Sequence, residues 1–259
     1  MSSVLALQVG TVARRSVLRT MRQPAMVVPA LFFPLLLLSI NSGALKSATR
    51  LPGFPTDNYL TFALGLAFLQ GTMFAAMSAG TNVAQDIETG FFNRLSLTPL
   101  RRAALLVGQL SGVLVLGLIQ ASTFLLVGIV AGAGLQAGVL GVPVIVALSL
   151  LTTLGFGSLG AFVALRTGSG EAVQGLFPLM FAALFLSSMS LPRNVIEIDW
   201  FRTIATWNPV SYMIEGIRSV LIVGWDGEAL ALGFLASGGL ALISLVLASS
   251  ALRTRMTRT

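Results

Sequence analysis

The chain has 259 residues, of which 55% are hydrophobic and only 10% are charged. A soluble domain carries about 25% charged residues, so this composition indicates an integral membrane protein, and the length allows one helical bundle. The absence of cysteine and histidine excludes disulfides, Cys/His metal sites and histidine acid–base chemistry. The net charge of +7 comes from arginines beside apolar segments. That placement favours membrane topology and contact with lipid over nucleic-acid binding.

The chain contains one lysine, Lys46, which lies between Leu45 and Ser47. A Walker A loop needs a Gly-Lys-Ser/Thr sequence to hold nucleotide phosphates. We therefore expect no nucleotide site, no bound cofactor and no catalytic residue in this chain. If ATP drives the protein, the ATPase is a separate polypeptide.

Residues 1–22 contain no membrane span but have the spacing of an amphipathic helix. A basic helix of this kind lies in the membrane interface, so we expect an interfacial helix here and not a cleavable signal. The alternative is an arginine cluster that only fixes topology. The polar face comprises Gln8, Thr11, Arg15, Arg19 and Arg22, and the apolar face comprises Val9, Ala13, Val17 and Met21.

Six apolar segments follow, each long enough for the ~20 residues that cross a ~30 Å hydrocarbon core. The third and fourth are separated only by the glycine-rich turn 132–138. The fourth and fifth are joined at 166–171, where Ser169 is expected to cap a helix with Glu171 in its first turn. The sequence thus predicts an all-α integral membrane protein with a single transmembrane domain over 1–259. The expected spans lie near 24–43, 59–81, 103–131, 139–165, 172–191 and 229–252.

The segment 82–102 is the longest polar interruption between apolar segments in the first two thirds of the chain. Two acids, Asp86 and Glu88, precede the aromatic pair Phe91 and Phe92, and three arginines follow. Aromatic anchors in a short loop with charges of both signs suit a docking element on the membrane surface. The alternative is a solvated turn whose arginines only fix topology.

The distribution of basic residues predicts which side of the membrane each loop occupies. With the N-terminus inside, eleven arginines lie in internal segments and five basic residues lie in external ones. This distribution satisfies the positive-inside rule. We therefore expect a multi-pass protein of a prokaryotic inner membrane, with both termini and the loop 82–102 in the cytoplasm.

The connection 191–228 is expected to hold two short re-entrant or interfacial helices on the outer side. Asn208 followed by Pro209 is typical of a helix N-cap and first turn, and a second amphipathic turn begins near Trp200. The alternative is a folded external cap with no role in transport. Helical spacing after Pro209 relates the apolar residues Val210, Met213, Ile214, Ile217 and Leu221, and leaves Glu215 and Arg218 on another face.

Polar side chains within the expected spans are amides and hydroxyls, and no acid or base lies in the middle of any span. Ion-coupled carriers generally need such an ionisable residue, so this pattern counts against one. Amides and hydroxyls mostly make interhelical hydrogen bonds, and the alternative is that they line a translocation path. The candidates for the path are Gln70, Gln120, Thr152, Ser187 and Asn208.

Three motifs, in this order among six spans, give the chain a resemblance to the permease subunits of type-2 ABC transporters, especially the drug- and lipid-exporting group related to daunorubicin-resistance permeases. The resemblance covers essentially the whole chain. The motifs are Glu88-Thr-Gly90 with Leu95-Ser-Leu-Thr98-Pro99, the stretch from Pro178 to Pro192, and Asn208-Pro209-Val-Ser-Tyr212 with Glu215-Gly-Ile-Arg218.

The resemblance implies a half-transporter: two permease copies, identical or related, with two cytoplasmic ABC ATPase subunits that bind ATP and Mg²⁺. It also implies a coupling helix in the loop 82–102 that docks on the ATPase, with the N-terminal helix beside it. The residues carried over as ATPase contacts are Gln85, Asp86, Glu88, Thr89, Gly90, Phe91, Phe92, Arg94, Leu95, Arg15 and Arg19.

The function implied is export of a hydrophobic or amphipathic molecule, such as a drug, lipid or glycolipid, from the cytoplasm or the inner leaflet. Two alternatives stay open from the sequence. One is a passive channel or ion-coupled carrier, and the other is a membrane assembly factor without a transport role. Substrate identity does not follow from the residues.

Overall fold

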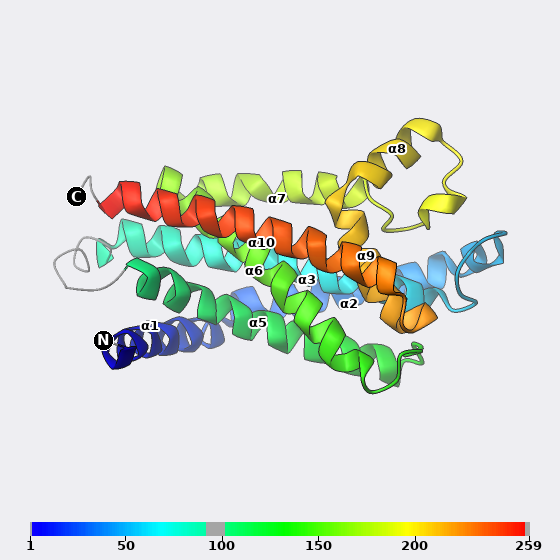
Figure 1. Cartoon of the computed structure of the whole chain (residues 1–259), viewed down its shortest axis with the longest axis horizontal. Coiled ribbons are helices and arrows are strands. Elements are labelled where there is room, and N and C mark those ends of the chain that lie inside the picture. Colours follow the sequence, from blue (N-terminus) through cyan, green and yellow to red (C-terminus); the bar gives the residue numbers. More distant parts are fainter. Residues whose placement is uncertain (1, 92–101, 257–259) are drawn as a thin grey trace.

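The computed structural model describes residues 2–91 and 102–256, which form helices joined by turns and short loops (Figure 1). The expected all-α architecture is confirmed for this part of the chain. The α-helices are α1 (Ser2–Met21), α2 (Pro24–Ala44), α3 (Tyr59–Glu88), α5 (Arg102–Val130), α6 (Gly141–Thr167), α7 (Gly170–Phe185), α8 (Asp199–Trp207), α9 (Pro209–Arg218) and α10 (Gly227–Met256). Shorter elements are the 3-10 helices η1 (Lys46–Arg50) and η2 (Arg193–Val195) and the π-helical turn η3 (Ser219–Val223).

Five helices in the described residues are long and apolar enough to cross a membrane: α2, α3, α5, α6 and α10. These match five of the six expected spans. The segment 172–191 differs, because α7 ends at Phe185 after 16 residues. At 1.5 Å per residue it is about 24 Å long, shorter than a ~30 Å hydrocarbon core.

Helix α3 is the centre of the bundle. Of its most apolar stretch 83% is buried inside the chain, against 17% for α2 and 22% for α10. Close approach of α3 and α6 depends on small residues: a Cβ atom at Gly160 would lie 2.2 Å from the carbonyl oxygen of Ala76. The outer faces of α2 and α10 are therefore left for lipid or another chain.

Caps and turns follow the local sequence signals. The Ser169 side chain accepts hydrogen bonds from the first amides of α7, with Glu171 in the first turn. Gly132 and Gly138, which bound the turn between α5 and α6, have φ of 92° and 64°, a region that favours glycine. The Asn208 side chain caps α9 by accepting from the amide of Val210 at 2.9 Å. These expectations are confirmed.

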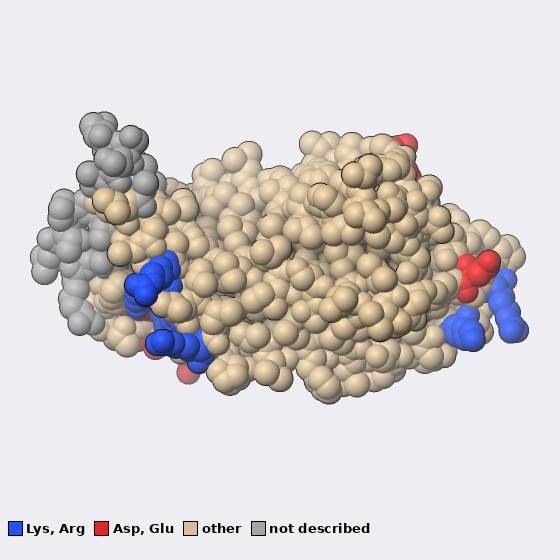
Figure 2. All heavy atoms as spheres, turned by 90° about the horizontal axis from the view of Figure 1, so that it is seen from below, with Lys and Arg blue, Asp and Glu red and all other residues tan. Residues whose placement is uncertain are grey.

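The bundle has two distinct ends. The chain ends, the C-terminal end of α3 and the turn 168–169 gather at one end, called here the termini end (Figure 1). Helix α8 and the turn 131–140 lie at the opposite end (Figure 1). On the face drawn in Figure 2, charged side chains gather at the two ends and an uncharged surface separates them. An uncharged surface between two charged ends is what a membrane-spanning bundle requires.

Candidate functional site

A buried carboxylate at the termini end joins three helices. Asp86, near the end of α3, is 2% exposed. Arg15 of α1 binds both of its oxygens, at 2.9 and 2.7 Å, and Arg19 donates to Oδ1 at 2.7 Å. From α5, the Gln109 amide donates to Oδ2 at 2.7 Å. Asp86, Arg15, Arg19 and Gln109 are called the Asp86 cluster. Both carboxylate oxygens of Asp86 are hydrogen-bonded by side chains of this same chain.

Helix α1 reaches this cluster because glycines on α5 let it approach closely. A Cβ atom at Gly108 would lie 2.5 Å from Val12, and one at Gly112 would lie 2.5 Å from the Ser16 hydroxyl. The Ser16 hydroxyl donates to the Gln109 carbonyl at 2.8 Å. The helix expected over residues 1–22 is present as α1, and its most buried face, which packs inside the chain, contains Val12, Ser16 and Thr20.

The segment expected as a loop over 82–102 begins as helix. Helix α3 continues to Glu88, because polar residues of its last turns are bound by α1 and α5. Gln85, Glu88 and Thr89 are exposed at this end, and Gly90 has φ of 68°.

The remaining residues carried over as ATPase contacts lie beyond α3. The Arg15 guanidinium lies 3.8 Å from the ring centroid of Phe91. Hydrogen bonding to Asp86 raises the pKa of Arg15 above its ordinary value, against the opposing effect of burial. Arg15 therefore stays charged and links α1 to both Asp86 and Phe91. Phe92, Arg94 and Leu95 lie outside the described residues.

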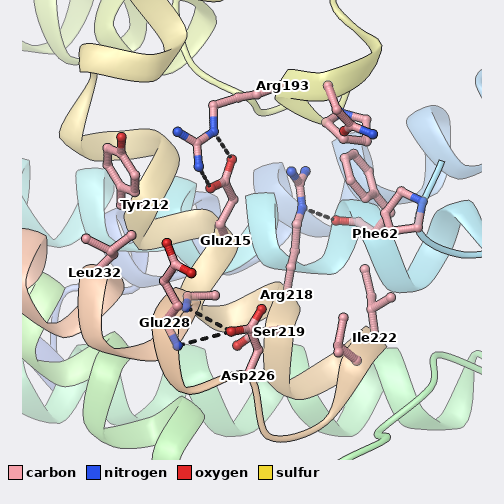
Figure 3. Close-up of a pocket in the computed structure, with 15 residues that line it drawn as sticks. Phe62, Arg193, Tyr212, Glu215, Arg218, Ser219, Ile222, Asp226, Glu228 and Leu232 are labelled. Carbon is pink, nitrogen blue, oxygen red and sulfur yellow. Dashed lines mark hydrogen bonds and ion pairs between the residues drawn. The ribbon is translucent and has the colours of Figure 1, made fainter. Parts of the chain in front are cut away.

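The end of the bundle opposite the termini contains a cavity of about 490 Å³ (Figure 3). Its charged wall includes an ion pair: Nε and Nη2 of Arg193 donate to the two Glu215 oxygens at 2.9 and 2.6 Å. The same guanidinium lies over the ring of Tyr212, with the Arg193 Cζ atom 4.6 Å from the ring centroid. Asp226 accepts from two backbone amides at the start of α10. Residues of η2, α9 and α10 thus line the cavity together.

Arg218 closes the inner side of this cavity. It is 4% exposed, and its guanidinium donates to the main-chain carbonyls of Phe62, Ser188 and Met189. These bonds tie α9 to α3 and to the residues that follow α7. The apolar residues that share a face after Pro209 are buried, but their helical spacing gave no sign that Arg218 is buried with them. Arg193 was also missed, since nothing near it in the sequence signals a partner 22 residues away.

Four of the five residues expected to line a path are buried, and the fifth, Asn208, is half-buried. The Thr152 hydroxyl lies 2.9 Å from that of Ser237 in α10, and Ser187 and Asn208 bond to carbonyls near the end of α7. Among the described residues, the side-chain oxygens of Gln70 and Gln120 are without a partner. The structure thus places these five residues in helix contacts, and the two glutamines retain unused acceptors.

Comparison with known proteins identifies the kind of chain that carries these features. Residues 7–222 match the family model described as "ABC-2 type transporter". The chain is 27% identical over 174 residues to the daunorubicin resistance ABC transporter permease protein DrrB1 of Streptomyces coeruleorubidus, covering 64% of this chain and 59% of that protein. It is 25% identical over 154 residues to the probable doxorubicin resistance permease DrrC of Mycobacterium tuberculosis H37Rv, covering 58% and 55%.

The putative transport permease ycf38 of Porphyra purpurea is 24% identical over 215 residues, covering 82% of this chain and 73% of that protein. The matched part spans less than two thirds of the two drug-resistance relatives. Because the family model covers most of the chain and five described helices are long and apolar enough to span a membrane, the chain belongs to the ABC-2 type transporter family and is a multi-pass ABC transporter permease.

Proposed function

We propose that this chain is the membrane-spanning half of an ATP-driven exporter, powered by separate ABC ATPase subunits. Its cargo is a hydrophobic or amphipathic molecule taken from the cytoplasm or the inner leaflet. The family match supports the permease role, and the sequence has no Gly-Lys-Ser/Thr motif of its own. The observation that carries the proposal is the Asp86 cluster, which fixes α1 against the end of α3.

The proposed ATPase contact begins where α3 ends. Gln85, Glu88 and Thr89 present exposed side chains there, and a carboxylate at Glu88 suits charge-assisted hydrogen bonds from basic groups of a partner. Asp86 has another role in this proposal: it is a positioning residue that holds α1 through Arg15 and Arg19. When the ATPase moves this contact surface, α1, α3 and α5 then move together, because the Asp86 cluster joins them.

The remaining proposed ATPase contacts follow α3. Gly90 and Phe91 continue the contact surface, with Phe91 held beneath Arg15. Phe92, Arg94 and Leu95 are included from the resemblance, since they follow directly in the sequence.

The proposed orientation places the termini end in the cytoplasm of a prokaryotic inner membrane, on the arginine distribution of the whole sequence. In this orientation α1 lies at the inner surface and the segment 191–228 at the outer surface. We include α7 as the sixth span, with the residues after Phe185 completing the crossing beneath α9. The short helices α8 and α9 then form the outer re-entrant pair.

The proposed translocation path follows a row of phenylalanines where α2 and α7 flank α3. The ring centroids of Phe33 and Phe74 are 5.7 Å apart, and Phe33 is 6.4 Å from Phe181. Phe177 lies 5.4 Å from Phe74 and 4.5 Å from Phe181. An apolar aromatic row suits an amphipathic cargo, and a second permease copy, identical or related, would cover it. The unused acceptors of Gln70 and Gln120 are the polar contacts proposed for the cargo when the helices separate.

The proposed path residues also include Thr152, Ser187 and Asn208, which stabilise the helices around the row of phenylalanines. Their side chains hold the helices at the ends and the back of the path. The cargo class is drawn from the names of the drug-resistance relatives, which refer to daunorubicin and doxorubicin.

Inside-out membrane vesicles test this function directly. With the permease and its ATPase co-expressed, we expect ATP-dependent uptake of fluorescent doxorubicin, and no uptake with either polypeptide alone. The ATPase is identified by co-purification with the tagged permease. Uptake without any ATPase would instead support a channel or carrier, and a permease that recovers no ATPase would contradict the two-polypeptide account.

A further inference from the structure

A second cavity lies along α1 at the termini end and has a volume of about 430 Å³. Four of the six residues that line it are arginines, and one is a leucine. Basic side chains are visible at this end of the molecule in Figure 2. The lining residues are Thr11, Arg14, Arg15, Leu18, Arg19 and Arg22, and together they define the α1 groove.

The four arginines of the α1 groove carry more positive charge than the chain itself neutralises. Arg15 and Arg19 share the carboxylate of Asp86. Arg14 and Arg22 are exposed, and within the described part of the chain neither guanidinium has an ion pair or hydrogen bond. Four cations therefore face one buried anion, and two of the four are free to bind a ligand. The chemistry that fits is an anion with several acceptor oxygens.

The position of the α1 groove places it at the membrane surface. Arg22 lies two residues before Pro24, where the first candidate span begins, so its Cα is within about 8 Å of that start. Leu18, on the groove wall, is 40% exposed, and the neighbouring Met21 is 41% exposed. Exposed apolar side chains beside arginines, at the start of a span, are typical of a helix at the boundary between headgroups and acyl chains.

We propose that the α1 groove binds the phosphate headgroup of an anionic phospholipid from the adjacent leaflet. Arg14 and Arg22 bind the phosphate oxygens, while Leu18 contacts the upper part of an acyl chain. Arg15 and Arg19 add positive potential and are held in place by Asp86. This inference does not depend on the proposed export function, because it concerns binding to the permease alone.

A matched pair of double variants isolates the site. Arg14→Gln/Arg22→Gln removes the two free charges and leaves the Asp86 cluster intact. Lys46→Gln/Arg50→Gln removes two exposed charges at the opposite end of the bundle. Each full-length protein is mixed in detergent with equal amounts of phosphatidylglycerol and phosphatidylcholine, and bound lipid is counted by native mass spectrometry. A parallel series contains millimolar glycerol 1-phosphate.

The parent and the Lys46→Gln/Arg50→Gln control are expected to retain phosphatidylglycerol in preference to phosphatidylcholine. The Arg14→Gln/Arg22→Gln variant is expected to lose roughly 30-fold in phosphatidylglycerol affinity, the value for two basic residues at an anionic lipid surface. Glycerol 1-phosphate should not displace the lipid, because it lacks the acyl chain.

Three results would overturn the proposal. Equal binding of both lipids, or an unchanged preference in the Arg14→Gln/Arg22→Gln variant, would show that the α1 groove does not select the headgroup. Full displacement by glycerol 1-phosphate would identify a site for free phosphate. Loss of ATPase co-purification in this variant, with lipid binding intact, would assign the two arginines to the ATPase.

Discussion

The guanidinium of Arg218 lies over the ring of Phe62, with Cζ 3.4 Å from the ring centroid, and its Nε donates to the Phe62 carbonyl at 2.8 Å. A charge-bearing side chain thus joins α9 to the central helix α3 in a buried site. Gly65 makes room for this arrangement, since a Cβ atom there would lie 2.9 Å from Cγ of Arg218. The two other carbonyls that Arg218 binds belong to the residues that follow α7.

Replacing Arg218 should destabilise the end of the bundle opposite the termini. Arg218→Met keeps the length of the side chain but leaves three carbonyls without this donor. The Phe62 carbonyl lies inside α3 and keeps a backbone donor, but the Ser188 and Met189 carbonyls lose theirs. Each buried polar group left unsatisfied costs about 1–3 kcal/mol, so the loss is expected to be about 2 kcal/mol or more. The measurement is the unfolding temperature of the detergent-purified chain, followed by fluorescence-detected size exclusion.

Arg202→Met is the control for that experiment. Arg202 bonds to Asp199 within α8 at an exposed position, and surface pairs contribute at most about 1 kcal/mol. An Arg218→Met protein as stable as Arg202→Met would show that the buried guanidinium does not hold α9 to α3.

Neutralising Asp86 should loosen α1. Asp86→Asn keeps the shape of the side chain but leaves Arg15 and Arg19 without their anion, and the amide nitrogen of asparagine cannot accept hydrogen bonds from them. The chain has no cysteine, so a Ser16→Cys substitution supplies a single thiol, buried against α5 in the parent. Maleimide labelling at this thiol should accelerate in Asp86→Asn. Asp57→Asn, at an exposed loop residue, should leave the labelling rate unchanged.

The glycine face of α5 offers a steric test of the same contact. A Cβ atom at Gly112 would meet the Ser16 hydroxyl at 2.5 Å and the Ser16 carbonyl oxygen at 2.7 Å. Gly112→Ala is therefore expected to push α1 away and lower the unfolding temperature. Gly239→Ala, in α10, meets no atom within 4 Å and should stabilise by about 0.5–1 kcal/mol through helix propensity. Equal behaviour of the two variants would mean that α1 does not pack on α5 in this way.

Single thiols also report the orientation of the bundle. A cysteine at Ser3 should resist an impermeant thiol reagent in intact cells, because the termini end is proposed to be cytoplasmic. A cysteine at Asp57, an exposed residue at the opposite end, should be labelled. Labelling at Ser3 would reverse the orientation and place the end of α3 outside the cell.

Much of the fold could be predicted from the sequence because it depends on local signals. Five of the apolar segments are long enough to span a membrane, and the Ser169 and Asn208 caps act within a few residues of their own positions. Helix α7 shows where such signals fail. Its apolar stretch continues past Phe185, but contacts with α9 end the helix there.

The Asp86 cluster could be predicted only in part. Charged residues after the second apolar segment indicated a polar surface element, but Asp86 and Glu88 look alike in sequence. Asp86 is buried and bound by arginines 71 and 67 residues away, whereas Glu88 is exposed. The face that α1 buries likewise depends on Gly108 and Gly112 of α5. Contacts between distant segments carry no periodic signal in the chain.

Recovery of the ATPase with a Glu88→Ala permease tests the proposed coupling most directly. Glu88 is exposed at the end of α3, so the substitution should leave the bundle folded. Loss of one partner of a desolvated charge pair costs about 2–5 kcal/mol, which lowers ATPase affinity at least ~30-fold. Glu171→Ala, the same change in another exposed residue at the termini end, is the control. We predict that Glu88→Ala loses the ATPase and ATP-driven doxorubicin uptake while Glu171→Ala keeps both; normal ATPase recovery and uptake with Glu88→Ala would contradict the proposed coupling.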